Sequence, residues 1–153
     1  MPLDLDVVKA SFPTAVPMVG TLGLEWVKLT RDTASLRLPD QTAYHNHIAG
    51  PHAGAMFTLG ESASGAIVLA SFGDQLDRLV PLAVEAKIRY LKVAMGSVTA
   101  TARLSRPLAD IQAEVEAGTT RPEFDVDIVI TDAAGVITGE MTVKWTLKLI
   151  RKA

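Results

Sequence analysis

The chain has 153 residues, of which 48% are hydrophobic and 21% are charged, so it can bury one ordinary core without a metal or a disulfide. Fifteen Lys and Arg against seventeen Asp and Glu leave a net charge of −2. This balance argues against nucleic acid or an anionic membrane as a partner, because both require a basic surface. The absence of Cys excludes disulfides, thiolate catalysis and Cys-based metal sites.

We expect neither a leader peptide nor a membrane segment. The first ten residues contain two acids and little apolar length, unlike a signal peptide. The longest apolar stretch, residues 62–72, is shorter than the roughly 20 residues of a membrane span. No repeat or linker divides the chain, so we expect one cytoplasmic domain over residues 1–153.

The first half of the chain predicts two helices and two strands. Residues 5–12 fit a short helix that ends before Pro13, because proline disfavours helical geometry in the residue before it. The elements that follow are a strand, a second strand, a loop and a long helix, over residues 24–29, 33–38, 39–51 and 53–72.

The second half consists mainly of strands. Apolar and polar residues alternate as in half-buried strands over residues 82–93, 98–104, 124–130 and 141–149. The first of these strands loses its alternation, which a bulge near Tyr90 would explain. Apolar residues at helical spacing predict a short helix over residues 107–118. This order indicates an α+β fold with one mainly antiparallel sheet and a helix packed on it.

Glu61 is the only charged residue between Gln41 and Gly73. The helix around it is made of small and apolar residues and lacks the polar face of a surface helix, so Glu61 should lie in the core or beside a cavity. An ionised carboxylate is costly in such a place. It is either a structural residue paired with a donor from the preceding loop, or a general base or nucleophile with a raised pKa. The loop donors available for such pairing are His45, Asn46 and His47.

The start of the long helix is suited to bind negative charge. Residues 50–54 bring a turn directly into a helix whose first residues are small. Free backbone N–H groups at this end can hold a carbonyl oxygen that becomes negative during a reaction. Many helices begin in this way, so the feature is weak evidence by itself.

Asn46, His52-Ala53-Gly54 and Glu61 resemble the signature of hotdog-fold thioesterases of the PaaI type. In that family a His-Gly-Gly begins six residues after an Asn, and an Asp or Glu follows nine residues after the His. Residues 84–94 also resemble the strand that follows the helix in the family. The resemblance covers about residues 20–105 and 123–149, and the YiiD C-terminal-like or DUF4442-like branch is the nearest.

The resemblance implies a hotdog fold, in which a curved antiparallel sheet wraps a long central helix; the short helix over residues 107–118 is an insertion. It also implies hydrolysis of small or medium acyl- or aryl-CoA thioesters by homodimers, or by homotetramers, with coenzyme A present only as part of the substrate. The residues that the signature makes catalytic are Glu61, Asn46, His52, Ala53 and Gly54.

We expect Glu61 to activate water or to attack directly, the Ala53 N–H to polarise the thioester carbonyl, and Asn46 to orient the water or the carbonyl. The acyl group is expected in an apolar tunnel beside the helix, and the CoA phosphates near basic side chains. The residues assigned to these roles are Met56, Phe57, Tyr90 and Leu91 for the tunnel, and Lys87, Arg89 and Lys92 for the phosphates.

The chain also departs from the family pattern. Ala53 replaces the first Gly of the motif, and Ala83 stands where some relatives carry Ser or Thr, which leaves a non-catalytic acyl-CoA binder as one alternative. A 3-hydroxyacyl thioester dehydratase is another, because His47 and Glu61 lie fourteen residues apart, as in hotdog dehydratases. We expect no metal site at the three histidines, because Glu61 is the only carboxylate placed to complete one.

The spacing of Ala53 and Glu61 predicts a shared active site. Eight residues separate them, which is about 12 Å along a helix axis. A general base has to come within roughly 3 Å of the group that it serves, directly or through one water. We therefore expect a twofold dimer in which each site takes Asn46 and the Ala53 N–H from one chain and Glu61 from the other.

Overall fold

The computed structural model describes residues 3–150, which form one sheet and four α-helices. The elements in chain order are α1 (Leu5–Ala15), α2 (Pro17–Thr21), β1 (Glu25–Leu29), β2 (Ala34–Leu38), η1 (Thr42–Tyr44), α3 (Ala53–Phe72), η2 (Gly73–Gln75), β3 (Leu79–Tyr90), β4 (Val98–Leu104), α4 (Leu108–Glu116), β5 (Glu123–Asp132) and β6 (Ile137–Leu149).

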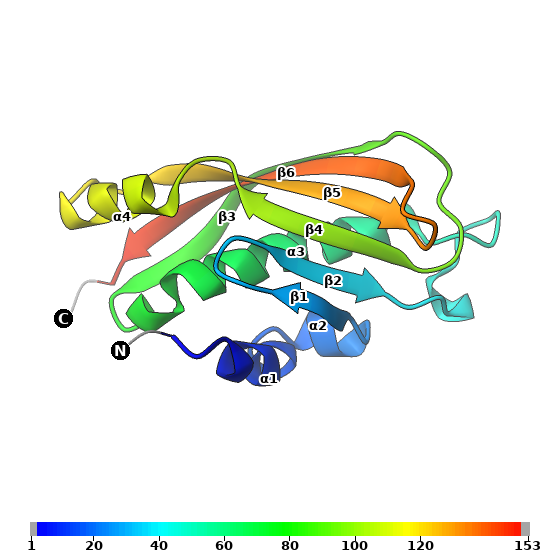
Figure 1. The fold of residues 1–153 in the computed structure, drawn as a ribbon, viewed down its shortest axis with the longest axis horizontal. Coiled ribbons are helices and arrows are strands. Elements are labelled where there is room, and N and C mark those ends of the chain that lie inside the picture. Colours follow the sequence, from blue (N-terminus) through cyan, green and yellow to red (C-terminus); the bar gives the residue numbers. More distant parts are fainter. Residues whose placement is uncertain (1–2, 151–153) are drawn as a thin grey trace.

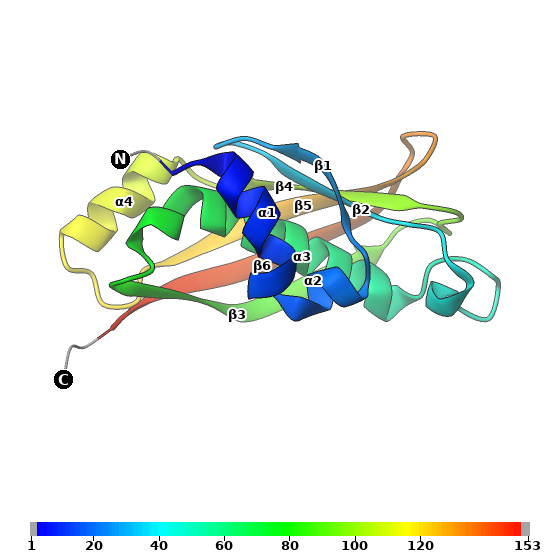
Figure 2. The same ribbon diagram turned by 90° about the horizontal axis from the view of Figure 1, so that it is seen from below.

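The six strands form one antiparallel sheet in the order β1-β2-β4-β5-β6-β3. The sheet curves along α3 and covers one side of it (Figure 1). Seen from below, α1 and α2 lie over the opposite side of α3 (Figure 2). This arrangement confirms the predicted α+β fold with a long central helix wrapped by an antiparallel sheet.

Small residues let α3 serve as the core of the domain. Twelve of its twenty residues are buried, and a Cβ added at Gly60 would lie 2.6 Å from the Met141 sulfur of β6. The segment Ala53–Gln75 is long and apolar enough to cross a membrane by composition alone, but most of it is buried inside the domain. Burial on both sides explains why the sequence of α3 shows no polar face.

The first helix is longer than predicted. We expected it to end at Phe12, but α1 continues through Pro13 to Ala15. Proline has no N–H, so the carbonyl of Lys9, four residues earlier, loses its helical partner. The Trp26 indole donates its Nε1–H to this carbonyl at 3.2 Å. A contact from β1 thus supplies the hydrogen bond that Pro13 cannot.

The bulge in β3 also differs from the prediction. The pairing of β3 with β6 shifts between Ala83 and Glu85, so the extra residue is Val84 and not a residue near Tyr90. The pairing is regular from Glu85 to Tyr90. The other predicted helices and strands are confirmed, with ends displaced by at most four residues, whereas α2 was not predicted.

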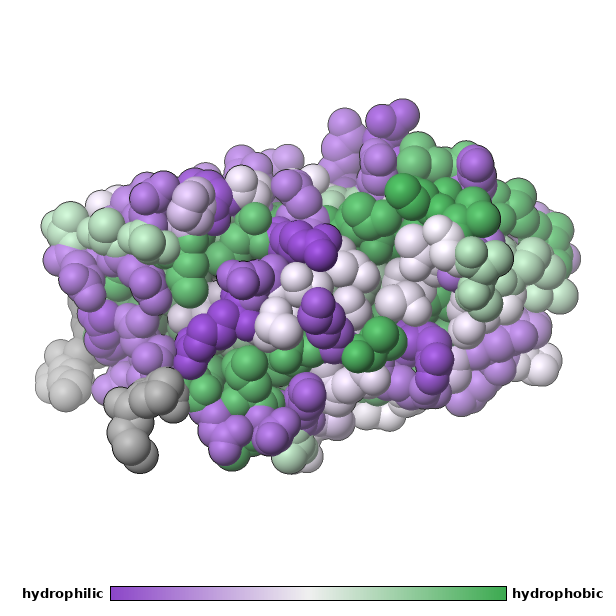
Figure 3. Space-filling view, viewed as in Figure 1, coloured by the Kyte–Doolittle hydropathy of each residue, from purple (hydrophilic) through white to green (hydrophobic). Residues whose placement is uncertain are grey.

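β3 is the long edge of the sheet. It has twelve residues, pairs only with β6 within residues 3–150, and exposes Val80, Leu82 and Val84. Apolar residues also gather at the end of the molecule that carries the β5–β6 hairpin and the β3–β4 connection (Figure 3). The exposed apolar residues there include Leu91, Val93, Met95 and Val136 in the two connections and Ile137 at the start of β6.

Candidate active site

Glu61 lies in the third turn of α3 and is partly buried. Burial raises the pKa of its carboxyl group, because the charged form loses solvation. Within residues 3–150 the carboxylate accepts no hydrogen bond and forms no ion pair, yet its oxygens are not sealed from solvent. A carboxylate in this condition is free to accept a proton from a bound water or ligand.

The loop residues proposed to pair with Glu61 have other partners or none. The His45 ring Nε2 lies 2.7 Å from an Asp40 carboxylate oxygen. The Asn46 side chain binds the backbone of its own loop, and His47 is exposed. The structure therefore does not bring these three residues to Glu61, and it offers no structural partner for the carboxylate within the described part of the chain.

A buried hydrogen-bond chain fixes the helix turn that carries Glu61. The Trp145 indole of β6 donates its Nε1–H to the Ser64 hydroxyl at 3.0 Å. That hydroxyl donates to the Glu61 carbonyl at 2.7 Å. Because both side chains are buried, this link ties the position of Glu61 to the sheet.

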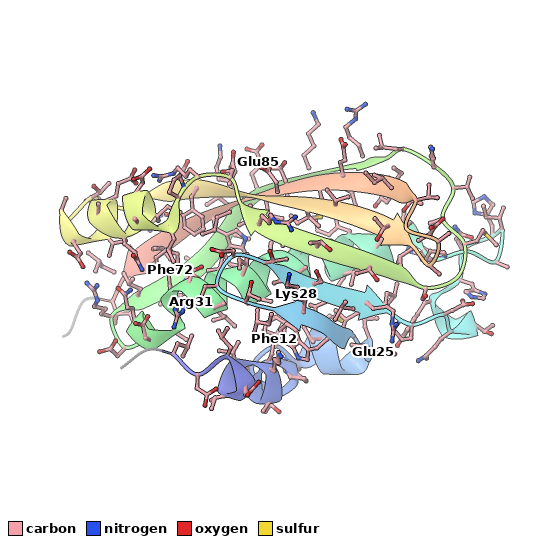
Figure 4. All side chains as sticks on the ribbon, viewed as in Figure 1. Phe12, Glu25, Lys28, Arg31, Phe72 and Glu85 are labelled. Atoms are coloured by element: carbon pink, nitrogen blue, oxygen red, sulfur yellow. The ribbon has the colours of Figure 1, made fainter. Side chains whose placement is uncertain are left out.

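A partly open cavity of about 230 Å³ lies beside Glu61. On α3 it follows one helix face from Glu61 to Leu69. α1 contributes Phe12, which points from that helix into the domain (Figure 4). β6 contributes Trp145, and β3 contributes Pro81. Apart from Glu61 and one serine, the lining is apolar, so the cavity suits an apolar ligand group held next to a carboxylate.

The N–H groups of Ala53 and Gly54 at the start of α3 differ in their hydrogen bonds. The His52 ring Nδ1 accepts a hydrogen bond from the Gly54 N–H at 2.9 Å, so the N–H of Gly54 is already used. The exposed Ala53 N–H forms no hydrogen bond with any part of the chain that the structure describes. At the positive end of the helix dipole, Ala53 is therefore the signature residue with a donor available for an oxyanion.

Asn46 shapes the loop before the helix. Its Oδ1 accepts hydrogen bonds from the N–H groups of Ile48 and Gly50 at 3.0 and 3.1 Å, and its Nδ2 donates to the Pro51 carbonyl at 3.4 Å. Both acceptor positions of Oδ1 are thus occupied. In this geometry Asn46 positions the loop that leads to Ala53; its predicted contact with water or substrate stays a prediction.

Of the four expected tunnel residues, Met56 and Phe57 belong to the start of α3, and Tyr90 of β3 contacts it. The Tyr90 hydroxyl donates to the Ala53 carbonyl at 2.8 Å, and burial raises the pKa of Tyr90. Leu91 is exposed, Met56 is buried and Phe57 is partly buried. None of these four residues lines the cavity beside Glu61, which extends toward the other end of the helix. The tunnel at these four residues therefore stays a prediction, and the cavity beside Glu61 is a second candidate place for the acyl group.

The basic residues proposed to hold CoA phosphates lie on the outer surface. Lys87 and Arg89 are exposed and alternate with half-buried residues of β3, so they lie on the sheet face turned away from α3. Glu85 points outward on the same strand (Figure 4). Lys92 is exposed in the connection after β3. No group of three His, Asp or Glu residues within residues 3–150 is placed to hold a metal ion.

Sequence reasoning missed the roles of Phe12, Ser64 and Trp145. Ser64 lies three residues after Glu61 in an apolar helix, and this spacing was a usable signal for a hydroxyl bonded to a backbone carbonyl. Trp145 and Phe12 look like ordinary core residues in the sequence. Their position beside Glu61 depends on long-range packing that no local pattern encodes.

The sequence matches the family described as a domain of unknown function, DUF4442, over residues 6–147. It matches none of the curated proteins. Among solved structures, PA5026 of Pseudomonas aeruginosa, described as a protein of unknown function and probable thioesterase, is 27% identical. It superposes with a TM-score of 0.84 over 98% of this chain and 99% of that chain.

Two more distant structures share the fold. A thioesterase family protein of Silicibacter pomeroyi is 22% identical, with a TM-score of 0.72 over 94% of this chain and 96% of that chain. A mutant of the thioesterase PA1618 of Pseudomonas aeruginosa is 19% identical, with a TM-score of 0.75 over 98% and 97%. The chain therefore belongs to the DUF4442 family and has the hotdog fold of the thioesterase superfamily.

Proposed function

We propose that this protein is a thioester hydrolase that acts on acyl-CoA. The observation that carries the proposal is the partly buried Glu61 carboxylate, which has a raised pKa, no partner within residues 3–150 and an apolar cavity beside it. A general base needs a pKa closer to neutrality than an ordinary carboxylate has, and burial moves it in that direction. The probable thioesterase from Pseudomonas aeruginosa, similar over nearly its whole length, supports the same class of reaction.

In the proposed reaction Glu61 takes a proton from water while the water oxygen attacks the thioester carbonyl carbon. The carbonyl oxygen becomes negative and accepts a hydrogen bond from the Ala53 N–H of a second subunit. The adduct then collapses, the C–S bond breaks, and the CoA thiolate takes up the proton that Glu61 received. The thiolate is a good leaving group, so no further acid is required.

Two features support the second subunit in this proposal, the length of α3 and the exposed edge of the sheet. Ala53 and Glu61 of one helix are about 12 Å apart along its axis. β3 is a long edge strand with exposed apolar side chains, and such edges favour pairing with another strand. If β3 pairs with its own copy around a twofold axis, the helices run antiparallel and each Glu61 faces the partner's first helical turn.

The proposal places the protein in the cytoplasm as a homodimer, with a homotetramer of two such dimers, joined through the apolar end of the sheet, as the alternative assembly. Coenzyme A enters only as part of the substrate, and no other cofactor is needed. The net charge of −2 supports a small-molecule substrate over nucleic acid or a membrane.

Incubation of the purified protein with a panel of acyl-CoA thioesters tests this function. Release of free thiol, lost in Glu61→Gln, is the expected result. Interconversion of 3-hydroxyacyl-CoA and enoyl-CoA, followed by absorbance, would instead show the dehydratase. Protection from thermal unfolding without either reaction would show a non-catalytic binder.

A further inference from the structure

We propose that the cavity between α1, α3 and β6 is the acyl site. Its size limits the substrate to straight-chain or aromatic acyl groups of roughly six to nine carbons. The scale for this limit is an apolar cavity of about 150 Å³, which holds one benzene ring. The inference rests on the proposed function and adds the substrate class and the residues that set it. The cavity volume is about 230 Å³.

The position of the cavity fits an acyl chain attached to a carbonyl near Glu61. Five of its lining residues, from Glu61 to Leu69, lie on two turns of α3, so the cavity runs about 12 Å along the helix. The one carboxylate stands at the first of these residues, and Ser62 beside it is the only other polar residue of the lining. A thioester carbonyl held beside Glu61 would therefore direct its hydrocarbon part along this face of the helix.

The end of α1 and the residue after it close the cavity on one side. Phe12 and Val16 line it from the side opposite the sheet. Phe12 is almost completely buried and packs on the Trp26 ring with a centroid separation of 5.4 Å. A wall held in this way cannot move aside cheaply for a longer chain.

Gly65 leaves space in the middle of the cavity. A Cβ added at Gly65 would lie 3.7 Å from the Trp145 ring, an ordinary contact distance. Gly65→Val should therefore fill part of the cavity without forcing the helix away from β6. Leu69→Ala should enlarge the cavity at its far end. Gly60 is unsuitable for such a test, because a side chain there would clash with Met141.

The first experiment measures kcat/KM for straight-chain acyl-CoA substrates from two to sixteen carbons and for phenylacetyl-CoA. We expect a maximum between six and nine carbons. In Gly65→Val the added side chain should exclude about two methylenes of a long acyl chain from the cavity. Because each buried methylene contributes about 0.8 kcal/mol, the ratio of octanoyl- to butyryl-CoA activity should fall about tenfold in this variant. Leu69→Ala should shift the maximum to longer chains. Ala109→Val, which adds bulk on the exposed side of α4, is the control and should change nothing.

The second experiment detects binding without catalysis. The chain has two tryptophans: Trp145 lines the cavity, whereas Trp26 supports α1 and is kept. Titration of the wild type with 1-octanol should change the tryptophan emission in a saturable way, and Gly65→Val should weaken this response.

The two experiments separate the two hypotheses. Saturable octanol binding without hydrolysis of any thioester would contradict the proposed reaction but would still support the cavity as a binding site for apolar groups. Hydrolysis whose chain-length profile moves in neither Gly65→Val nor Leu69→Ala would overturn the assignment of the acyl site. The absence of a saturable octanol response in the wild type would overturn it as well.

Discussion

Ala53 and Glu61 lie on one uninterrupted helix, about 12 Å apart along its axis. Ala53 offers an N–H that has no acceptor within residues 3–150, and Glu61 carries the carboxylate. A rigid helix cannot bring these two groups to one carbonyl carbon. The geometry of a single chain thus separates the donor for an oxyanion from the base for a water. This separation is the main physical reason to expect an active site built from two subunits.

The Ala53 N–H can be removed without disturbing the helix. Ala53 is the first helical residue, where proline is well tolerated, and His52 before it has φ −62° and ψ 140°, which a following proline permits. We expect Ala53→Pro to fold normally and to lose about 10²–10³-fold in kcat, the usual cost of one oxyanion donor. Ala53→Ser keeps the N–H and serves as the control. Equal activity of the proline and serine variants would exclude this donor from the reaction.

The activity should depend on the ionisation of Glu61. Burial raises the pKa of its carboxyl, and only the ionised form can accept a proton from water. We expect kcat/KM to fall on acidification with an apparent pKa above the ordinary Glu value of about 4.3. The measurement is a pH–rate profile from pH 4 to 9 with a substrate that is stable in this range. An acid limb at or below the ordinary value would mean that another group controls the rate.

The same carboxylate should lower stability at neutral pH. Because burial raises its folded-state pKa, the folded protein holds this proton more tightly than the unfolded chain does. The resulting stabilisation is full below the unfolded pKa and is lost as pH rises through the folded pKa. We therefore expect Glu61→Gln to unfold at a higher urea concentration than the wild type at pH 8, with a smaller difference at pH 4.

The exposed Glu123→Gln is the matched control for this stability measurement and should show no such pH-dependent gain. Turnover by Glu61→Gln should meanwhile fall about 10²–10⁴-fold. A Glu61→Gln protein that is less stable than the wild type at pH 8 would show that the ionised carboxylate has a stabilising partner.

The hydrogen bond from Trp145 to Ser64 should be measurable by a double-mutant cycle. Ser64→Ala leaves the buried indole N–H without an acceptor, at a cost of about 1–3 kcal/mol in unfolding free energy. In the Trp145→Phe background that donor is gone, so the same substitution should cost less. Urea unfolding of the two single variants and the double variant gives the coupling. Additive losses would show that the bond contributes nothing to stability.

The sequence predicted the elements whose signals are local. The ends of α3 follow from the Gly-Pro turn before Ala53 and from Gly73 after Phe72, and the long α3 itself follows from a run of small apolar residues. The alternating strands β4, β5 and β6 were equally accessible. The strand order was not predicted, because antiparallel neighbours far apart in the chain are chosen by packing of the whole sheet.

The site was predictable only in part. The residue types and spacings of Asn46, Ala53 and Glu61 identified the candidates, but the capping of Gly54 by His52 became visible only with the loop in place. A cavity beside Glu61 was one of two expectations, but its lining could not be predicted, since its walls come from α1, α3, β3 and β6. The continuation of α1 past Pro13 has the same origin, because it depends on the Trp26 indole.

The most direct test of the shared site mixes two inactive variants, Ala53→Pro and Glu61→Gln, which are unfolded together in equal amounts and refolded. Random pairing makes half of the dimers mixed, each with one intact site and one doubly altered site, so about a quarter of wild-type activity should return. Native mass spectrometry confirms the mixed dimers, and each variant refolded alone is the control. A mixture that contains mixed dimers but is as inactive as its parents would show that each chain carries a complete site.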